Sequence, residues 1–177
     1  MDFTDLNKAC PKDPFPIPWI NLLMDATVGH PQMSFLHAFQ GYHKIPLALS
    51  DKKKTVFITS IGSYHYKVMP FRLKNAWSTY QRMMTRMFEP QLGKNIEIYI
   101  DDIVVKSNVV FKHVGDLGNI FEILSKHKLC LNVSKCSFGE GSGKFLGYMV
   151  THQGIEVNLD QIKAINSLQP PRNPKEV

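Results

Sequence analysis

The feature that most constrains this chain is a pair of short apolar segments separated by only two aspartates. Residues 96–100 and 103–105 are dominated by β-branched and aromatic side chains, which favour strands. Asp101 and Asp102 are all that lies between them, so two strands here can pair only through a tight turn. The sequence therefore predicts an antiparallel hairpin with two carboxylates at its tip.

The other predicted elements follow one another in an irregular order. Apolar residues at helical spacing predict helices at residues 75–92, 111–127 and 159–168. Apolar or alternating runs predict strands at residues 33–36, 45–49, 55–61, 64–69, 129–133 and 144–150. Prolines at alternate positions forbid a helix and predict an extended segment within residues 1–20. This order predicts an α+β fold and not a regular βαβ winding.

The composition describes a chain that can bury a core and that carries excess positive charge. Of its 177 residues, 44% are hydrophobic, which excludes a wholly disordered chain. The 21 Lys and Arg outnumber the 15 Asp and Glu, and the net charge of +6 favours a polyanionic partner. Lys52, Lys53 and Lys54 form a basic run that is either solvated surface or a phosphate contact.

Nothing in the sequence indicates a membrane or a secretory route. No apolar run approaches the roughly eighteen residues of a membrane span, and the acidic start lacks the apolar segment of a signal peptide. Cys10, Cys130 and Cys136 make neither an even disulfide set nor a metal-like pair. We therefore expect an intracellular protein that is not secreted and has no membrane partner.

The two aspartates suggest a metal site. Adjacent carboxylates raise each other's pKa unless a cation neutralises them. Mg²⁺ is a natural partner because it takes hard oxygen ligands and keeps positions for water and substrate phosphates. Aspartate is also common in turns, and the pair alone favours this simpler interpretation. The flanking apolar strands and the basic composition shift the balance toward the metal site.

Several short motifs resemble those of reverse transcriptases. Tyr-Ile-Asp-Asp at residues 99–102 resembles the Tyr-x-Asp-Asp box of that family. Other motifs occur in family order: Asp-Phe-Thr-Asp-Leu-Asn-Lys at residues 2–8, Met-Pro-Phe at 69–71, Leu-Lys-Asn-Ala at 73–76, Thr-Tyr-Gln-Arg at 79–82, Asn-Val-Ser-Lys-Cys-Ser-Phe at 132–138 and Phe-Leu-Gly-Tyr at 145–148. Together they are most similar to the reverse transcriptase domain of a gypsy-class plant LTR retrotransposon Pol polyprotein.

This resemblance implies a fold and an activity. It implies a palm domain, an antiparallel sheet backed by helices, with partial fingers at residues 1–155, and the start of a thumb or connecting region at residues 156–177. The implied activity is RNA-directed DNA polymerisation, in which two Mg²⁺ ions, with Mn²⁺ as an alternative, assist nucleotidyl transfer to a primer 3′-hydroxyl. The implied partners are an RNA or DNA template with its primer and deoxynucleotide triphosphates.

The resemblance also implies a parent protein and a set of site residues. RNase H and integrase modules would adjoin this fragment in the polyprotein, which works in a cytoplasmic particle or the nucleus. The implied metal-binding catalytic residues are Asp101 and Asp102. The other implied site residues are Tyr42, which excludes a 2′-hydroxyl, Phe71 and Gln81 for the nucleotide, and Phe145, Leu146 and Gly147 as the primer grip.

Three positions depart from the family pattern. Where the family has Phe-x-Asp-x-x-x-Gly-Tyr, residues 35–42 place His37 at the first catalytic aspartate. Imidazole suits Zn²⁺ or Cu²⁺, whereas Mg²⁺ requires oxygen ligands. Arg72 replaces a glycine that permits a positive φ or a close backbone approach. Trp77 replaces Gly or Pro, and we expect its indole to crowd the template or the nucleotide.

The departures imply a reverse transcriptase fragment with impaired catalysis. A catalytically dead remnant that still binds nucleic acid is the alternative. A third hypothesis is a phosphate-handling metal enzyme that shares only the Asp-Asp hairpin, and the other ordered motifs argue against it. Primer extension on an RNA template separates the first two hypotheses.

Overall fold

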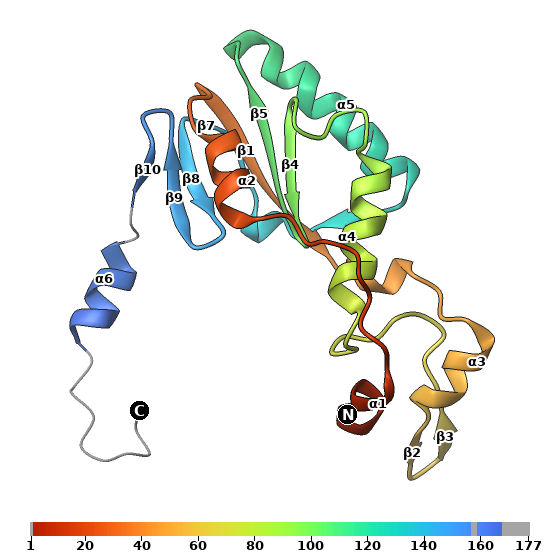
Figure 1. The fold of residues 1–177 in the computed structure, drawn as a ribbon. Coiled ribbons are helices and arrows are strands. Elements are labelled where there is room, and N and C mark those ends of the chain that lie inside the picture. The colour runs from red at the N-terminus through yellow and green to blue at the C-terminus, as the bar shows by residue number, and fades with distance from the viewer. Residues whose placement is uncertain (1, 157–158, 168–177) are drawn as a thin grey trace.

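A computed structural model of the protein describes residues 2–156 and 159–167, which are organised around a central antiparallel sheet (Figure 1). The sheet runs in the order β4-β5-β1-β6, and β7 pairs with β1 outside this path. Its strands are β1 (Gln32–Phe39), β4 (Ile96–Tyr99), β5 (Asp102–Ser107), β6 (Cys130–Leu131) and β7 (Ser137–Glu140). The central strands β1 and β5 pair from Gln32 opposite Ser107 to His37 opposite Asp102.

Two helices, α4 (Ala76–Met87) and α5 (His113–Lys126), cover one face of the sheet (Figure 1). Alternate side chains of a strand point to the same face, so every second residue of β4 and β5 reaches these helices. The fully or almost fully buried residues of this core include Ile96, Ile98, Ile103 and Val105 from the strands, and Tyr80, Met84, Ile120 and Leu124 from the helices.

The opposite face of the sheet has a second core. It is covered by α2 (Ile20–Thr27) and by a three-stranded sheet of β8 (Ser142–Phe145), β9 (Tyr148–Thr151) and β10 (Ile155–Glu156). The buried members of this core are Leu23, Met24, Met33, Phe35, Val104, Phe145 and Val150. The central sheet therefore buries apolar side chains on both faces.

The segment between β1 and α4 extends beyond the sheet, together with the first helix, as a small lobe (Figure 1). Its elements are α1 (Thr4–Ala9), η1 (Gly41–Lys44), α3 (Leu49–Lys52), η2 (Lys53–Thr55), β2 (Phe57–Thr59) and β3 (Gly62–Tyr64). The remaining elements are η3 (Val110–Lys112), η4 (Val133–Lys135) and α6 (Leu159–Asn166). Among the described residues, no helix is long and apolar enough to cross a membrane.

Several sequence predictions are confirmed and four need correction, one of which is the strand expected at residues 64–69, where only Tyr64 belongs to a strand, β3 (Gly62–Tyr64). The hairpin at residues 96–105 and the second helix are present, and the fold is α+β. Residues 45–49 form only an isolated bridge between Pro46 and Val68, and not a strand. The helix expected to reach residue 92 ends at Met87, because Pro90 lacks an amide hydrogen and restricts the residue before it. Residues 144–150 contain a turn between two strands.

A buried hydrogen-bond chain joins α5 to both central strands. The Gly139 amide donates to Ser34 Oγ, which lies 2.7 Å from His113 Nε2. Ser107 Oγ lies 2.8 Å from His113 Nδ1 and donates to Asp116 Oδ2 at 2.6 Å. Because Ser107 uses its hydrogen on Asp116, it accepts from Nδ1. Ser34 Oγ accepts from Gly139 and keeps its hydroxyl hydrogen, which it can donate to Nε2 of a neutral imidazole.

We predict that this neutral histidine makes folding stability depend on pH. Burial lowers the pKa of His113, although Asp116 opposes the shift. An unfolded histidine with a pKa of about 6.5 therefore binds protons before the folded one, and the free energy of unfolding falls as the pH drops below this value. Urea unfolding at pH 7.5, 6.5 and 5.5 measures the slope. His113→Gln should flatten it, while the exposed-site control His152→Gln should not; equal slopes in all three proteins would contradict the prediction.

Candidate active site

The tip of the β4–β5 hairpin is one residue earlier than the sequence suggests. Tyr99 pairs with Asp102, so Ile100 and Asp101 form the two-residue turn and Asp102 is already the first residue of β5. Ile100 has a φ of +55°, which is rare for a β-branched side chain. The neighbouring structure must therefore hold this turn in place.

Helix α4 supplies that support through the buried side chain of Gln81. Its Nε2 donates to the Ile98 carbonyl at 3.1 Å, and its Oε1 accepts from the Ile100 amide at 2.6 Å. On the other side, the Ala38 amide of β1 donates to the Asp101 carbonyl at 2.8 Å. Gln81 was expected at the nucleotide, which stays a prediction; its role as a clamp on the hairpin was not foreseen.

The carboxyl group of Asp101 has a buried oxygen, Oδ1, and the nearby Tyr80 hydroxyl acts on this carboxyl as a hydrogen-bond donor. Burial raises the pKa of this carboxyl, the charge of Asp102 adds to the rise, and His37 opposes it. The buried Tyr42 and Tyr80 rings lie nearby with their centroids 4.8 Å apart. Burial, followed by the charge of Asp101, raises the pKa of both phenols, which therefore stay protonated.

His37 contacts the hairpin carboxylate directly. It lies opposite Asp102 in the β1–β5 pairing, and its Nδ1 is 2.9 Å from Asp102 Oδ1. The amide of His37 also donates to Cys136 Sγ at 3.4 Å. The structure thus brings together the three positions that the resemblance assigned to catalysis, but one carboxylate oxygen is engaged by an imidazole.

This donor set does not fit a magnesium ion. Mg²⁺ favours near-octahedral oxygen coordination, whereas position 37 offers a ring nitrogen. Across residues 2–156 and 159–167, no three His, Cys, Asp or Glu side chains form a group that could hold a metal ion. A cavity of about 270 Å³ beside His37 and Asp102 is lined by Lys135 and Lys144. Lys135 also opposes the rise in the pKa of Asp101, so positive charge already reaches the carboxylates.

Tyr42 occupies a closely packed position beside these carboxylates. The Phe71 ring meets it edge-on, with centroids 5.9 Å apart, and Tyr80 packs on its other side. A Cβ at Gly41 would lie 2.1 Å from the Tyr80 hydroxyl oxygen, so this position accepts only glycine without rearrangement. Phe71 is 58% exposed and is available to a ligand.

The three predicted primer-grip residues form the end of the β8–β9 hairpin. Phe145 is buried in the second core and pairs with Tyr148. Leu146 and Gly147 connect the strands with φ values of +52° and +87°. Two positive φ values are typical of the type I′ turns that close tight hairpins.

The other two departures from the family pattern lie just before and within α4. Arg72 has a φ of +77°, which confirms that this position requires the backbone that glycine adopts easily. Asn7 holds the segment by donating to the Arg72 carbonyl at 2.9 Å and accepting from the Lys74 amide at 2.8 Å. Trp77 is 51% exposed, so about half of its surface is open to solvent.

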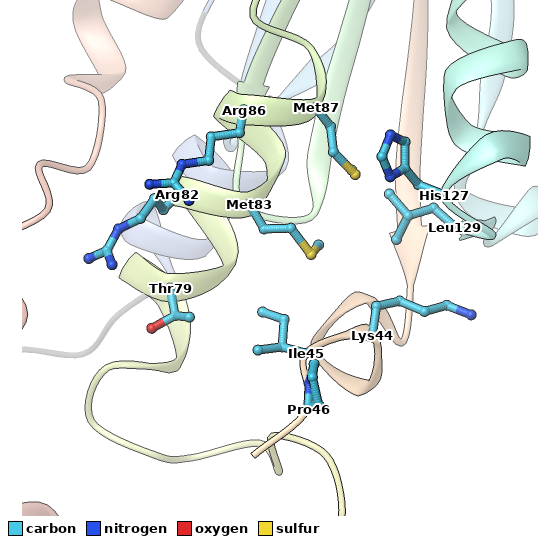
Figure 2. A pocket seen from close by; sticks show the side chains of 10 residues that line it. All are labelled: Lys44, Ile45, Pro46, Thr79, Arg82, Met83, Arg86, Met87, His127 and Leu129. Carbon is cyan, nitrogen blue, oxygen red and sulfur yellow. The ribbon is translucent and has the colours of Figure 1, made fainter. Parts of the chain in front are cut away.

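A larger cavity of about 500 Å³ lies between α4 and η1 (Figure 2). Met83 and Met87 point from α4 toward His127 and Leu129, whereas Arg82 projects from the other side of the helix. Arg82 forms an ion pair with Asp13 and lies over the Phe15 ring. None of the residues assigned to catalysis lines this cavity.

The family profile described as reverse transcriptase (RNA-dependent DNA polymerase) matches residues 1–150. The chain belongs to the reverse transcriptase family. It is 36% identical over 177 residues to the retrovirus-related Pol polyprotein from transposon opus of Drosophila melanogaster. It is 30% identical over 172 residues to the corresponding polyprotein from transposon gypsy of the same organism. These alignments cover 100% and 97% of this chain but only 18% and 16% of the relatives.

The fold comparison agrees with the sequence comparison. A foamy viral protease-reverse transcriptase solved in complex with an RNA/DNA hybrid superimposes with a TM-score of 0.88 at 20% identity, covering 99% of this chain and 24% of the viral chain. The reverse transcriptase fold with antiparallel sheet and helices is thereby confirmed. The chain is similar to the reverse transcriptase domains of LTR retrotransposon Pol polyproteins and spans less than a fifth of the relatives' length.

Proposed function

We propose that this chain is a reverse transcriptase fragment that binds primer and template but transfers nucleotides poorly. The observation that carries the proposal is the 2.9 Å contact between His37 Nδ1 and Asp102 Oδ1. Histidine at the position of the first aspartate removes one anionic oxygen ligand. Its imidazole also contacts an oxygen of a second ligand, Asp102. Reverse transcriptases generally use divalent metals, so losing such ligands weakens the chemical step directly.

The family's residue roles extend to this chain as part of the proposal. Asp101 and Asp102 would be the remaining catalytic and metal-binding residues, and His37 marks the lost third ligand. The family's two Mg²⁺ ions, or Mn²⁺ in their place, would bind weakly because the donor set does not fit them. The remaining roles are the 2′-hydroxyl exclusion of Tyr42, the nucleotide contacts of Phe71 and Gln81, and the primer contacts of Phe145, Leu146 and Gly147.

The proposal also covers the domains and the parent protein. Residues 1–155 would be the palm with partial fingers, and residues 156–177 the start of the thumb or connecting region; of the latter, 157–158 and 168–177 lie outside the described residues. The parent would be a gypsy-class plant retrotransposon polyprotein with RNase H and integrase modules. It would act inside the cell, in a cytoplasmic particle or the nucleus.

Charge supports nucleic acid as the partner. The net charge of +6 suits a phosphate backbone, and a structural relative was solved with an RNA/DNA hybrid. Lys52, Lys53 and Lys54 lie in the small lobe, where α3 passes into η2. The proposed partners are an RNA or DNA template with its primer, together with deoxynucleotide triphosphates.

We predict salt-dependent binding of an RNA/DNA hybrid with little or no primer extension. A chain that neutralises about four phosphates should lose roughly 100-fold in affinity between 50 and 200 mM salt. Fluorescence anisotropy with a labelled hybrid measures this slope. Changing Lys52, Lys53 and Lys54 to Gln should reduce the slope, while Lys112→Gln in η3 combined with Lys126→Gln in α5 should change it less. Absent or salt-independent binding would contradict the proposal, as would robust extension by the unaltered chain.

A further inference from the structure

Two exposed aromatic side chains lie beside the candidate active site. Trp77 is 51% exposed in the first turn of α4, and Phe71 is 58% exposed just before the helix. The neighbouring aromatic residues Tyr42 and Tyr80 are both buried. An exposed indole and an exposed phenyl ring next to a proposed nucleic-acid site offer flat apolar surface to a ligand.

The position of Trp77 on α4 places it near the hairpin tip. It precedes Tyr80 and Gln81 by three and four residues, so all three lie on the same side of the helix. Gln81 binds the backbone of Ile98 and Ile100, which puts Trp77 about one turn, or roughly 5 Å, further out along the helix. Helical side chains tilt toward the N-terminus of the helix, so the indole extends toward the side on which residues 71–75 lie.

Phe71 approaches the same corner from the other side. Its ring contacts Tyr42 edge-on at 5.9 Å, and Tyr42 packs on Tyr80 at 4.8 Å. Tyr80 is in turn on the same side of α4 as Trp77. The two exposed rings therefore flank one aromatic cluster that leads to Asp101, whose charge acts on both tyrosines.

The segment between the two rings is basic. Residues 71–77 contain Arg72 and Lys74 and no acidic residue. Both cations are exposed, and neither forms an ion pair within 4.0 Å among the residues that the structure describes. The Lys74 ammonium donates to a backbone carbonyl, that of Cys10, which leaves its charge uncompensated. The segment thus combines two flat rings with two positive charges.

We propose that Trp77 and Phe71 form a stacking platform for unpaired nucleobases, with Arg72 and Lys74 beside the phosphates. This inference rests on the proposed function, because it assumes that nucleic acid enters this corner. Single-stranded nucleic acid alternates exposed π faces with anionic phosphates, and stacking on aromatic side chains tolerates any sequence. In a duplex the bases are paired and stacked on one another, so their faces are not available to the two rings. Trp77 would hold an unpaired base where the family usually has glycine or proline.

Binding measurements on the 177-residue chain test the platform. Stacking on one base predicts that Trp77→Ala weakens binding of an unpaired twelve-nucleotide oligo-dT by roughly 10- to 100-fold, whereas Trp77→Phe keeps most of the affinity. The matched control is Trp19→Ala at the start of α2, which removes an indole that is 78% exposed and should change little. A duplex of the same length should bind all four proteins within about threefold of each other. Circular dichroism establishes that each variant is folded.

Tryptophan emission gives a second and independent readout. In the Trp19→Phe variant, Trp77 is the one remaining indole, and oligo-dT should quench its emission; the Trp77→Phe variant should show no comparable quenching. Equal losses with Trp77→Ala and Trp19→Ala, or an equal loss on the duplex, would overturn the platform. If hybrid binding stays salt-dependent but Trp77→Ala has no effect, only this inference fails. If the wild-type chain binds neither oligo-dT nor hybrid, the proposed function fails with it.

Discussion

His37→Asp is expected to raise the affinity of this chain for Mg²⁺ well above the weak binding proposed for the wild-type chain. The substitution places an anionic oxygen beside Asp101 and Asp102 and removes the imidazole that engages Asp102. Three clustered carboxylates repel one another, so a bound cation should stabilise the variant. At about ten times its dissociation constant, Mg²⁺ would add about 1.4 kcal/mol, or roughly 3–6 °C in melting temperature. Thermal unfolding with and without Mg²⁺ measures the shift.

Two matched variants separate ligand chemistry from charge alone. His37→Asn supplies a neutral oxygen, and His65→Asp adds the same charge on the exposed β3 side of the small lobe. Neither should produce the Mg²⁺-dependent shift. A comparable shift in the His65→Asp variant, or in the wild-type chain, would show that position 37 does not control metal binding.

Polymerisation should recover less than metal binding does. Loss of a metal ligand that stabilises the transition state by about 4 kcal/mol slows the reaction roughly a thousandfold. In a complete polymerase containing this chain as its palm, His37→Asp should restore part of that loss, since the other two departures, Arg72 and Trp77, lie at positions that the resemblance assigns to the nucleotide and template side. Reversion of all three should exceed the sum of the single reversions, because residues that share one site act non-additively. Robust primer extension by the unreverted chain would show that His37 is tolerated.

The second large effect concerns stability, and we expect it from the buried ion pair of Lys106 and Glu97. Their side chains are only 3% and 6% exposed, Lys106 Nζ lies 2.7 Å from Glu97 Oε1, and the same amine donates to the Ala26 carbonyl in α2. Lys106→Ala would leave a carboxylate buried without its cation, at a cost of about 3–5 kcal/mol. Urea unfolding should show this loss as a lower midpoint at similar slope.

A double substitution provides the internal control for that prediction. Replacing both charges, with Lys106→Met and Glu97→Leu, removes the uncompensated group and fills the site with apolar volume. Such replacements of buried ion pairs are often neutral or stabilising. The double variant should therefore be markedly more stable than Lys106→Ala. A double variant as unstable as the single one would mean that the pair itself, and not the stranded charge, supports the fold.

Local sequence pattern was sufficient for the elements that are determined by neighbouring residues. The β-branched runs around Asp101 gave the central hairpin, and helical spacing gave most of α4 and α5. Gly93 predicts a helix that ends near residue 92, but α4 ends at Met87. The reason is Pro90, three residues before Gly93, which cannot donate a helical hydrogen bond. The strand expected at residues 45–49 was wrong because a short apolar run does not by itself distinguish strand from turn.

The contacts that complete the site depend on residues far apart in the chain, and so they were not visible in local pattern. Gln81 reaches Ile100 across nineteen positions, and His37 reaches Asp102 across sixty-five. The motif order predicted which residues would meet, but not that Gln81 would clamp the hairpin. Glu97 alternates with buried isoleucines, a pattern typical of a sheet that exposes one face to solvent. In the structure, α2 covers that face, and Glu97 is buried beneath it.

The buried carboxylate of Asp101 sets the order in which a polymerase site of this kind erodes. In the folded chain its burial costs free energy, which the contacts of Tyr80, His37 and Lys135 offset only in part, because the pKa of the carboxyl stays raised. Gln81 has the opposite effect on stability, because its side-chain amide is the hydrogen-bond partner of the Ile98 carbonyl and the Ile100 amide in the hairpin. A copy released from selection for catalysis would gain stability by losing Asp101 and would lose stability with Gln81. Decay would therefore remove the chemistry first and leave the scaffold recognisable long afterwards.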